Sequence, residues 1–142
     1  MVTAARAIAR KHTSGKYDKL LTFEDFDQLG HVITNSIDSL ITDSANSASS
    51  YATGHKASVN CLGVYADSSK DPFDDPKVEL LTELIRRRQP KKAIGIVSTA
   101  YGQDATPSAF TSHTRLRSTS AEITDQILHG VGNWTDAGKL HV

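Results

Sequence analysis

Apolar and polar positions follow two alternating patterns along the chain, one typical of helices and one typical of short strands. Helical spacing and good helix formers predict helices over residues 3–11, 44–53, 76–88, 107–115 and 122–128. Short β-prone or apolar runs predict strands over residues 31–34, 39–42 and 93–98. Strands that alternate with helices, with polar residues at the turns, indicate an α/β layer fold.

The predicted helix over residues 76–88 has the clearest boundaries. Asp75 suits the N-cap and Pro76 the first helical position. Its apolar residues recur on one face, and Glu83 with Arg87 forms a possible i,i+4 ion pair. Five basic residues, at 86–88 and 91–92, close this helix, where cations stabilise the C-terminal end of the helix dipole. We therefore interpret them as a helix end and not as a nucleic-acid site.

Composition excludes several classes of partner. The 142 residues contain 16 basic and 16 acidic side chains, so the net charge is zero and predicts no binding to nucleic acid or to an anionic membrane surface. No apolar run is long enough to span a membrane, and the N-terminus lacks the apolar core of a signal peptide. The single cysteine, Cys61, allows no internal disulfide and is predicted to be a buried small residue. Asn133 begins an Asn-Trp-Thr glycosylation triplet, which matters only in a secreted protein.

Reactive side chains gather where two predicted strands end, at residues 42–44 and 98–106. Sites in open α/β sheets lie at such carboxyl ends. Ser44 would begin a helix, where it could attack phosphate or could simply cap the helix. The chain has neither a G-x-S-x-G elbow nor a G-x-x-x-x-G-K-[ST] loop, so it is not predicted to be an α/β-hydrolase or a P-loop nucleotide binder. If Ser44 is a nucleophile, a base from elsewhere in the fold or a bound metal must activate it.

The residues after Ser44 are almost all small. Ala and Ser dominate residues 45–53, and Gly54 suits the C′ position. Small side chains let neighbouring backbone approach the helix closely, so the helix can be buried while its N-terminus points into a cleft.

Two blocks of the sequence are similar to the alkaline phosphatases. Residues 43–56, DSANSASSYATGHK, resemble the nucleophile segment of that family, with Asn46 and Ser49 as departures from its commonest form. Residues 95–117 resemble the family's strand, metal-binding turn and arginine-bearing helix in the family's order. The likeness covers about residues 2–128. It implies a three-layer α/β sandwich with a mostly parallel central sheet, of which residues 1–142 would form part of one catalytic domain without an internal boundary.

The resemblance implies a role for each matching residue. Ser44 resembles the serine that is phosphorylated and that also contacts zinc, and Arg117 the arginine that binds phosphate. Asp43 resembles the carboxylate that orients this arginine. Asp104 and Thr106 resemble magnesium ligands, whose hard oxygens suit Mg²⁺. Arg115 competes with Arg117 for the phosphate, although the spacing from Thr106 favours Arg117.

The resemblance also implies parts that this chain lacks. The family carries a Gly-Asp-Gly stretch before the segment that begins at Met1 and further zinc ligands beyond Val142. The six histidines show no metal-binding spacing and are expected to be surface or structural residues. We therefore expect a fragment of a phosphomonoester hydrolase that is inactive by itself, with zinc and magnesium as the cofactors of the complete enzyme.

The same residues are open to two further interpretations. A catalytically dead remnant would bind phosphate or a protein partner without turnover. A sulfatase-type relative needs a Cys or Ser in a C/S-x-P-x-R context, which Cys61 does not have. The resemblance also implies that the full-length relative takes small phosphomonoesters, is secreted or periplasmic, and forms a homodimer.

Overall fold

The computed structural model describes residues 1–12 and 19–131, and the chain divides into two compact units, Met1–Ile33 and Thr34–Val142. The first unit contains helix α1 (Val2–His12) and the 3-10 helix η1 (Thr22–Asp25). Arg6 forms an ion pair with Glu24, whose other carboxylate oxygen accepts the Leu21 N–H at 2.8 Å. The first unit is thus held by a link between its two helices, and α1 confirms the helix predicted over residues 3–11.

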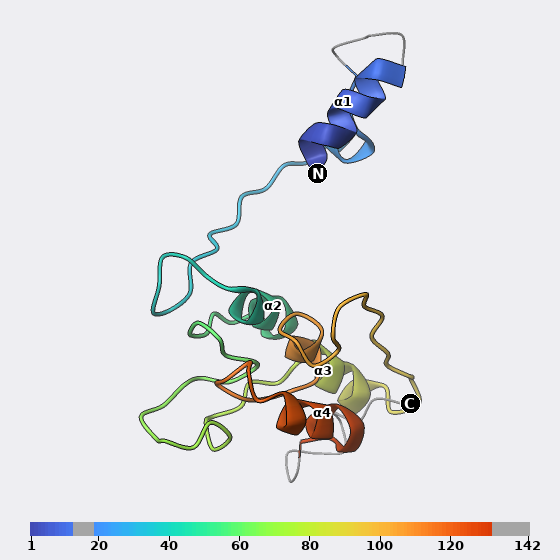
Figure 1. Ribbon diagram of the computed structural model, residues 1–142. Coiled ribbons are helices and arrows are strands. Elements are labelled where there is room, and N and C mark those ends of the chain that lie inside the picture. The colour runs from blue at the N-terminus through green and yellow to red at the C-terminus, as the bar shows by residue number, and fades with distance from the viewer. Residues whose placement is uncertain (13–18, 132–142) are drawn as a thin grey trace. The chain divides into compact units, whose positions relative to one another are not determined.

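The second unit contains three α-helices and one 3-10 helix among its described residues (Figure 1). They are α2 (Ser44–Thr53), α3 (Leu81–Arg88), η2 (Ser108–Phe110) and α4 (Ser120–His129). Helix α2 has the predicted bounds because Asp43 caps its start and Gly54, at φ 76°, ends it in the left-handed conformation. Helix α4 confirms the helix predicted over residues 122–128 and is slightly longer.

The predicted start of α3 at Pro76 is wrong. Asp75 does not cap a helix: its carboxylate accepts the Asp67 N–H at 2.9 Å and binds Arg115. Lys77 instead forms an isolated antiparallel bridge with Val64, which keeps this part of the chain extended. The helix begins five residues later, where Glu83 accepts the Leu80 N–H at 2.8 Å.

The predicted helix over residues 107–115 is also shorter than expected. Only η2 forms, because Thr114 pairs with Leu62 in a second isolated bridge, with N···O distances of 2.7 and 3.0 Å. That bridge holds the chain extended and brings residues 112–117 beside residues 60–64. The predicted ion pair of Glu83 with Arg87 is wrong as well, since Arg87 binds Glu79 at 2.6 Å and Glu83 binds His113.

The predicted strands over residues 31–34, 39–42 and 93–98 do not form within the described parts of the chain. Most of their apolar side chains are exposed, with Leu40, Ile41 and Val97 at 92, 82 and 102% of full exposure. A strand needs a neighbouring strand to pair with its backbone, and the β-bridges among the described residues lie elsewhere, between Leu62 and Thr114 and between Val64 and Lys77. The parallel central sheet is therefore absent from residues 1–12 and 19–131, which are mostly helix and loop.

The core of the second unit is made largely of small residues. One buried cluster comprises Ala45, Ala48, Leu62, Ala105, Ala109 and Ile123. Helix α2 packs against η2 through this cluster. The Ser49 hydroxyl lies in the same region, donating to the Cys61 carbonyl at 3.0 Å and accepting the Gly63 N–H at 3.1 Å. The prediction that small residues let backbone approach α2 is confirmed.

Cys61 is buried, as predicted. No described helix is both long and apolar enough to cross a membrane. Asn133 lies outside the described residues.

Candidate active site

Ser44 is the first residue of α2, but it does not cap the helix. The cap is Asp43, whose carboxylate accepts the N–H groups of Ala45 at 3.0 Å and Asn46 at 3.2 Å. The alternative role of Ser44 as a cap is therefore wrong. Its hydroxyl is exposed at the positive end of the helix dipole, where an anion is stabilised.

Arg117 links the start of helix α2 to Asp104. Its Nη1 donates to Ser44 Oγ at 2.9 Å and to Asp43 Oδ2 at 3.2 Å, and its Nη2 donates to Asp104 Oδ1 at 2.8 Å. The hydrogen bond and charge of Asp104, followed by those of Asp43, outweigh burial and raise the pKa of Arg117. The guanidinium therefore stays charged and is held in one orientation beside the serine.

Asp43 is held as a carboxylate by the same contacts. Partial burial raises the pKa of its carboxyl, but this effect is outweighed by the N–H groups of Asn60, Asn46 and Ala45 and by Arg117. The net result is a pKa below the ordinary value of 3.8. Asp43 thus caps α2 and fixes the arginine at once.

Thr106 shares a cavity with Ser44. Ser44, Asp104 and Thr106 line one cavity of about 360 Å³, together with residues 96–98. Ala105, between the two predicted magnesium ligands, has φ 45° and is buried in the α2 core, so the chain turns sharply there. The carboxylate of Asp104 and the hydroxyl of Thr106 are oxygen donors, which fit the preference of Mg²⁺.

The charge of these groups does not suit a phosphate by itself. Asp43 and Asp104 carry two negative charges and Arg117 carries one positive charge, which leaves a net charge of −1. A phosphomonoester dianion is repelled by such a set unless cations are added. Metal ions at this site would reverse the sign.

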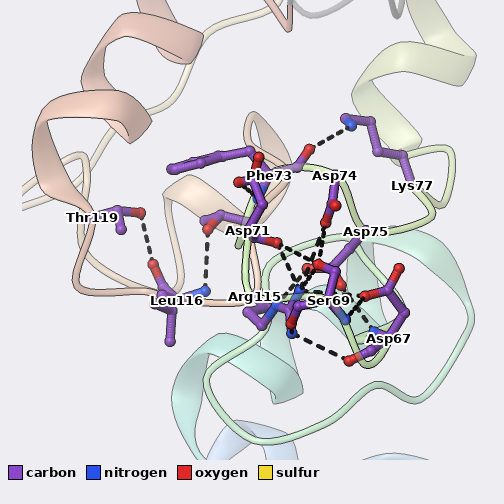
Figure 2. Close-up of polar contacts among 11 residues, drawn as sticks. Asp67, Ser69, Asp71, Phe73, Asp74, Asp75, Lys77, Arg115, Leu116 and Thr119 are labelled. Carbon is purple, nitrogen blue, oxygen red and sulfur yellow. Dashed lines mark hydrogen bonds and ion pairs between the residues drawn. The ribbon is translucent and has the colours of Figure 1, made fainter.

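Arg115 has a separate set of partners. It donates to Asp75 Oδ2 at 2.9 Å, to the carbonyl oxygens of Ser69 and Asp71, and to the Ser69 hydroxyl (Figure 2). Asp75 is buried, and Asp67 and Asp74 lie within ion-pair distance of the guanidinium. Arg115 therefore fastens the loop over residues 67–75, and Arg117 is the arginine that reaches Ser44.

The described histidines do not gather around Ser44. His113 is fully buried, with Nδ1 2.7 Å from the Gly63 carbonyl and Nε2 2.9 Å from Glu83 Oε1, which is a structural role. Within residues 1–12 and 19–131, the one group of three acidic, His or Cys side chains close enough to share a metal is Asp67, Asp74 and Asp75, the carboxylates around Arg115. These parts of the chain supply no complete zinc site at Ser44.

Asn60 is a site residue that the sequence predictions missed. Its N–H donates to Asp43 Oδ1 at 3.1 Å, and its carbonyl accepts the Arg117 N–H at 3.0 Å. Its φ of 68° is left-handed, which is uncommon for a residue other than glycine. Asparagine tolerates this conformation better than most residues, and this tolerance was the signal in the sequence that could have identified Asn60.

Comparison with known proteins places these residues in a family context. The family model described as alkaline phosphatase matches residues 1–134. The chain is 33% identical to the tissue-nonspecific alkaline phosphatase of Gallus gallus over 119 residues, which are 82% of this chain and 23% of that protein. It therefore spans about a quarter of the length of that relative.

Solved structures show the same likeness. The Thermus thermophilus alkaline phosphatase aligns with a TM-score of 0.65 at 22% identity, over 88% of this chain and 24% of that one. A mutant of the TAB5 alkaline phosphatase with Mg bound in its M3 site aligns with a TM-score of 0.63 at 24% identity, over 83% of this chain and 31% of that one. These likenesses concern the fold alone: the neighbouring structures have an α/β fold, and the described residues of this chain contain no strand.

Proposed function

This chain belongs to the alkaline phosphatase family, and from that premise we propose that it carries the nucleophile and the phosphate clamp of a phosphomonoester hydrolase. The observation that carries the proposal is the double contact of Arg117 Nη1, 2.9 Å from Ser44 Oγ and 3.2 Å from Asp43 Oδ2. One fixed guanidinium thus adjoins an exposed hydroxyl at a helix N-terminus.

The proposed chemistry is the one that the family resemblance implies, and these contacts support it. Ser44 Oγ attacks phosphorus and gives up its proton to solvent while the bond from phosphorus to the ester oxygen breaks, and the leaving alkoxide takes up a proton from solvent. Water then attacks the phosphoserine, the bond to Oγ breaks, and inorganic phosphate leaves as Ser44 regains its proton. Because Arg117 donates to Oγ, it stabilises the oxygen as negative charge develops on it. Its planar fork can bind two oxygens of the phosphoryl group.

Asp104 and Thr106 would hold Mg²⁺, and Ser44 would contact Zn²⁺. The shared cavity and the oxygen donors support the magnesium assignment. Bound divalent cations would supply positive charge for the transferring phosphoryl group and lower the pKa of a bound hydroxyl or water. Of the residues that the structure describes, Ser44 alone is assigned a zinc contact by the resemblance.

The remaining proposals concern the whole protein and rest on the resemblance. It would act on small phosphomonoesters as a secreted or periplasmic homodimer, with residues 1–142 as part of one catalytic domain. The 142-residue chain alone would be inactive, because its site has a net negative charge and its described residues lack a zinc ligand set.

A second candidate function is favoured by that same lack of ligands. A catalytically dead remnant that lacks a zinc ligand set in its described residues would bind a protein partner, or would bind phosphate only where added cations offset the net charge of −1. Binding and hydrolysis are therefore measured separately.

The test begins with the transcript on both sides of this reading frame. Further in-frame metal ligands would support the hydrolase, and stop codons on both sides would favour the second candidate. The encoded product is then assayed with an aryl phosphomonoester, Zn²⁺ and Mg²⁺. We expect Ser44→Ala to abolish turnover and Ser47→Ala, on the same helix, to preserve it. Turnover that survives Ser44→Ala would overturn the assignment of the nucleophile, and robust zinc-dependent turnover by the 142 residues alone would overturn their inactivity.

A further inference from the structure

Two residues other than glycine have positive φ in the described parts of the chain, and both adjoin the candidate site. Asn60 has φ 68° and Ala105 has φ 45°. A left-handed conformation is unfavourable for an L-residue and persists only where the surrounding contacts hold it. The contacts that hold a residue of the candidate site in this conformation are therefore relevant to how the site works.

The reason at Asn60 lies in its backbone. Its N–H contacts Asp43 Oδ1 at 3.1 Å, and its C=O contacts the backbone N–H of Arg117 at 3.0 Å. One residue therefore touches both members of the Asp43–Arg117 ion pair, which are 74 positions apart. Changing φ from positive to negative would rotate the N–H relative to the C=O, and the two contacts could not both be kept.

The neighbouring contacts fix Asn60 from outside. Two residues on, Leu62 and Thr114 exchange hydrogen bonds of 2.7 and 3.0 Å. The Cys61 N–H donates to the Ser58 carbonyl at 3.2 Å, across the turn that contains Asn60. Asn60 is thus the point where a fixed loop meets the arginine segment.

We infer that Asn60 is a positioning residue, whose left-handed backbone aligns Asp43 and Arg117 so that the guanidinium reaches Ser44. This role rests on the proposed function, in which Arg117 binds phosphate. The contacts are made by the backbone, so what matters is the conformation that residue 60 can adopt and not its amide group. The side chain is exposed and lines a cavity of about 570 Å³ with Arg117 and Asp104, so replacing it removes no core packing.

The test compares Asn60→Gly with Asn60→Val. Glycine adopts positive φ at no steric cost, whereas a β-branched residue strongly disfavours it. The first readout is amide hydrogen exchange at Arg117, whose N–H is bonded to the Asn60 carbonyl. We expect exchange about tenfold faster, or more, in Asn60→Val and within about twofold of the wild type in Asn60→Gly. The Leu62 amide, bonded to Thr114, is the internal control and should be unchanged in both.

The second readout is the affinity for inorganic phosphate in the presence of Mg²⁺ and Zn²⁺. We expect Asn60→Val to weaken binding about tenfold and Asn60→Gly to restore it. If Asn60→Val does not fold, Asn60→Ala replaces it, with the same direction and a smaller effect.

Three outcomes overturn the positioning role. They are unchanged Arg117 exchange in Asn60→Val, equal loss in Asn60→Gly, and faster exchange at Leu62 together with Arg117. A wild type that binds no phosphate overturns the proposed function instead, and the exchange comparison still decides the role of Asn60.

Discussion

Arg117 Nη1 lies 2.9 Å from Ser44 Oγ, although the two residues are 73 positions apart. The contact depends on backbone hydrogen bonds between two segments, because Thr114 pairs with Leu62 and the Arg117 N–H donates to the Asn60 carbonyl. Charge and geometry at the serine are therefore set by loops that meet at the N-terminus of one helix.

Replacing Arg117 by Lys should weaken the binding of inorganic phosphate about tenfold or more, which corresponds to roughly 1.4 kcal/mol. Lysine keeps the charge but cannot present two parallel N–H donors. Isothermal titration with Mg²⁺ and Zn²⁺ present measures the change. Arg88→Lys, at the exposed end of α3, serves as the control, and equal affinity of the Arg117 variant and the wild type would contradict the clamp.

Replacing Asp43 by Ala should lower the free energy of unfolding by about 1–2 kcal/mol at neutral pH, since it removes a helix cap. The folded pKa of Asp43 lies below its ordinary value of 3.8, so its charged form stabilises the fold above that pH. This contribution is lost as the pH falls through the folded pKa. Urea unfolding at pH 7 and at about pH 3 should show the difference from the wild type narrowing at the lower pH. A difference that stays constant or widens would refute it.

Replacing Arg115 by Ala should destabilise the second unit by about 3 kcal/mol, because the buried carboxylate of Asp75 would lose its charged partner. Thermal unfolding measures the loss. Arg87→Ala is the matched control, since it breaks only an exposed pair with Glu79 and should change the Tm little. Similar losses in the two variants would show that Arg115 does not fasten the 67–75 loop.

Gly63→Ala should lower the free energy of unfolding by more than about 1 kcal/mol. Gly63 has φ 58°, and an added Cβ would lie 2.9 Å from both His113 Nδ1 and Leu80 Cδ2. At Gly102 a Cβ would meet nothing within 4 Å, so Gly102→Ala should be nearly neutral. Chemical denaturation of the two variants side by side checks the prediction, which fails if they are equally stable.

Cys61 should react slowly with thiol reagents in the folded protein. Burial, together with the nearby negative charge of Asp75, raises the pKa of its thiol to about 11. At pH 8 only about one thiol in a thousand is then ionised. Ellman's reagent should label the unfolded chain rapidly and the native chain far more slowly. Rapid labelling under native conditions would show that the thiol is accessible.

Helices with local signals were predictable from the sequence, and elements that depend on distant partners were not. Asp43 and Gly54 bound α2 by contacts within the helix itself, so its limits could be read from the residues. Asp75 carries an equally good local signal, but its carboxylate is committed to Arg115, 40 positions away. The segment over residues 93–98 has strand composition and no partner within the described residues, so composition alone could not make it a strand.

The residues of the candidate site also differ in how well the sequence predicted them. The resemblance selected Ser44, Asp43, Arg117, Asp104 and Thr106. Arg117 contacts Ser44, Asp43 and Asp104, and Thr106 lines one cavity with Ser44 and Asp104. Their catalytic and metal-binding roles stay predictions. Asn60 escaped notice because it acts through its backbone, and a backbone contact leaves little trace in residue type.

Helix α2 has a consequence for how mutations in this protein are interpreted. Ala45, Ala48, Ser49 and Ala52 are all buried, with less than 4% exposure, and they leave no room for a larger side chain. A saturation mutagenesis screen scored by activity would therefore report a row of intolerant positions beside Ser44. None of the four side chains hydrogen-bonds to Arg117. The screen would therefore count these tightly packed small residues as catalytic residues unless protein abundance were scored alongside activity.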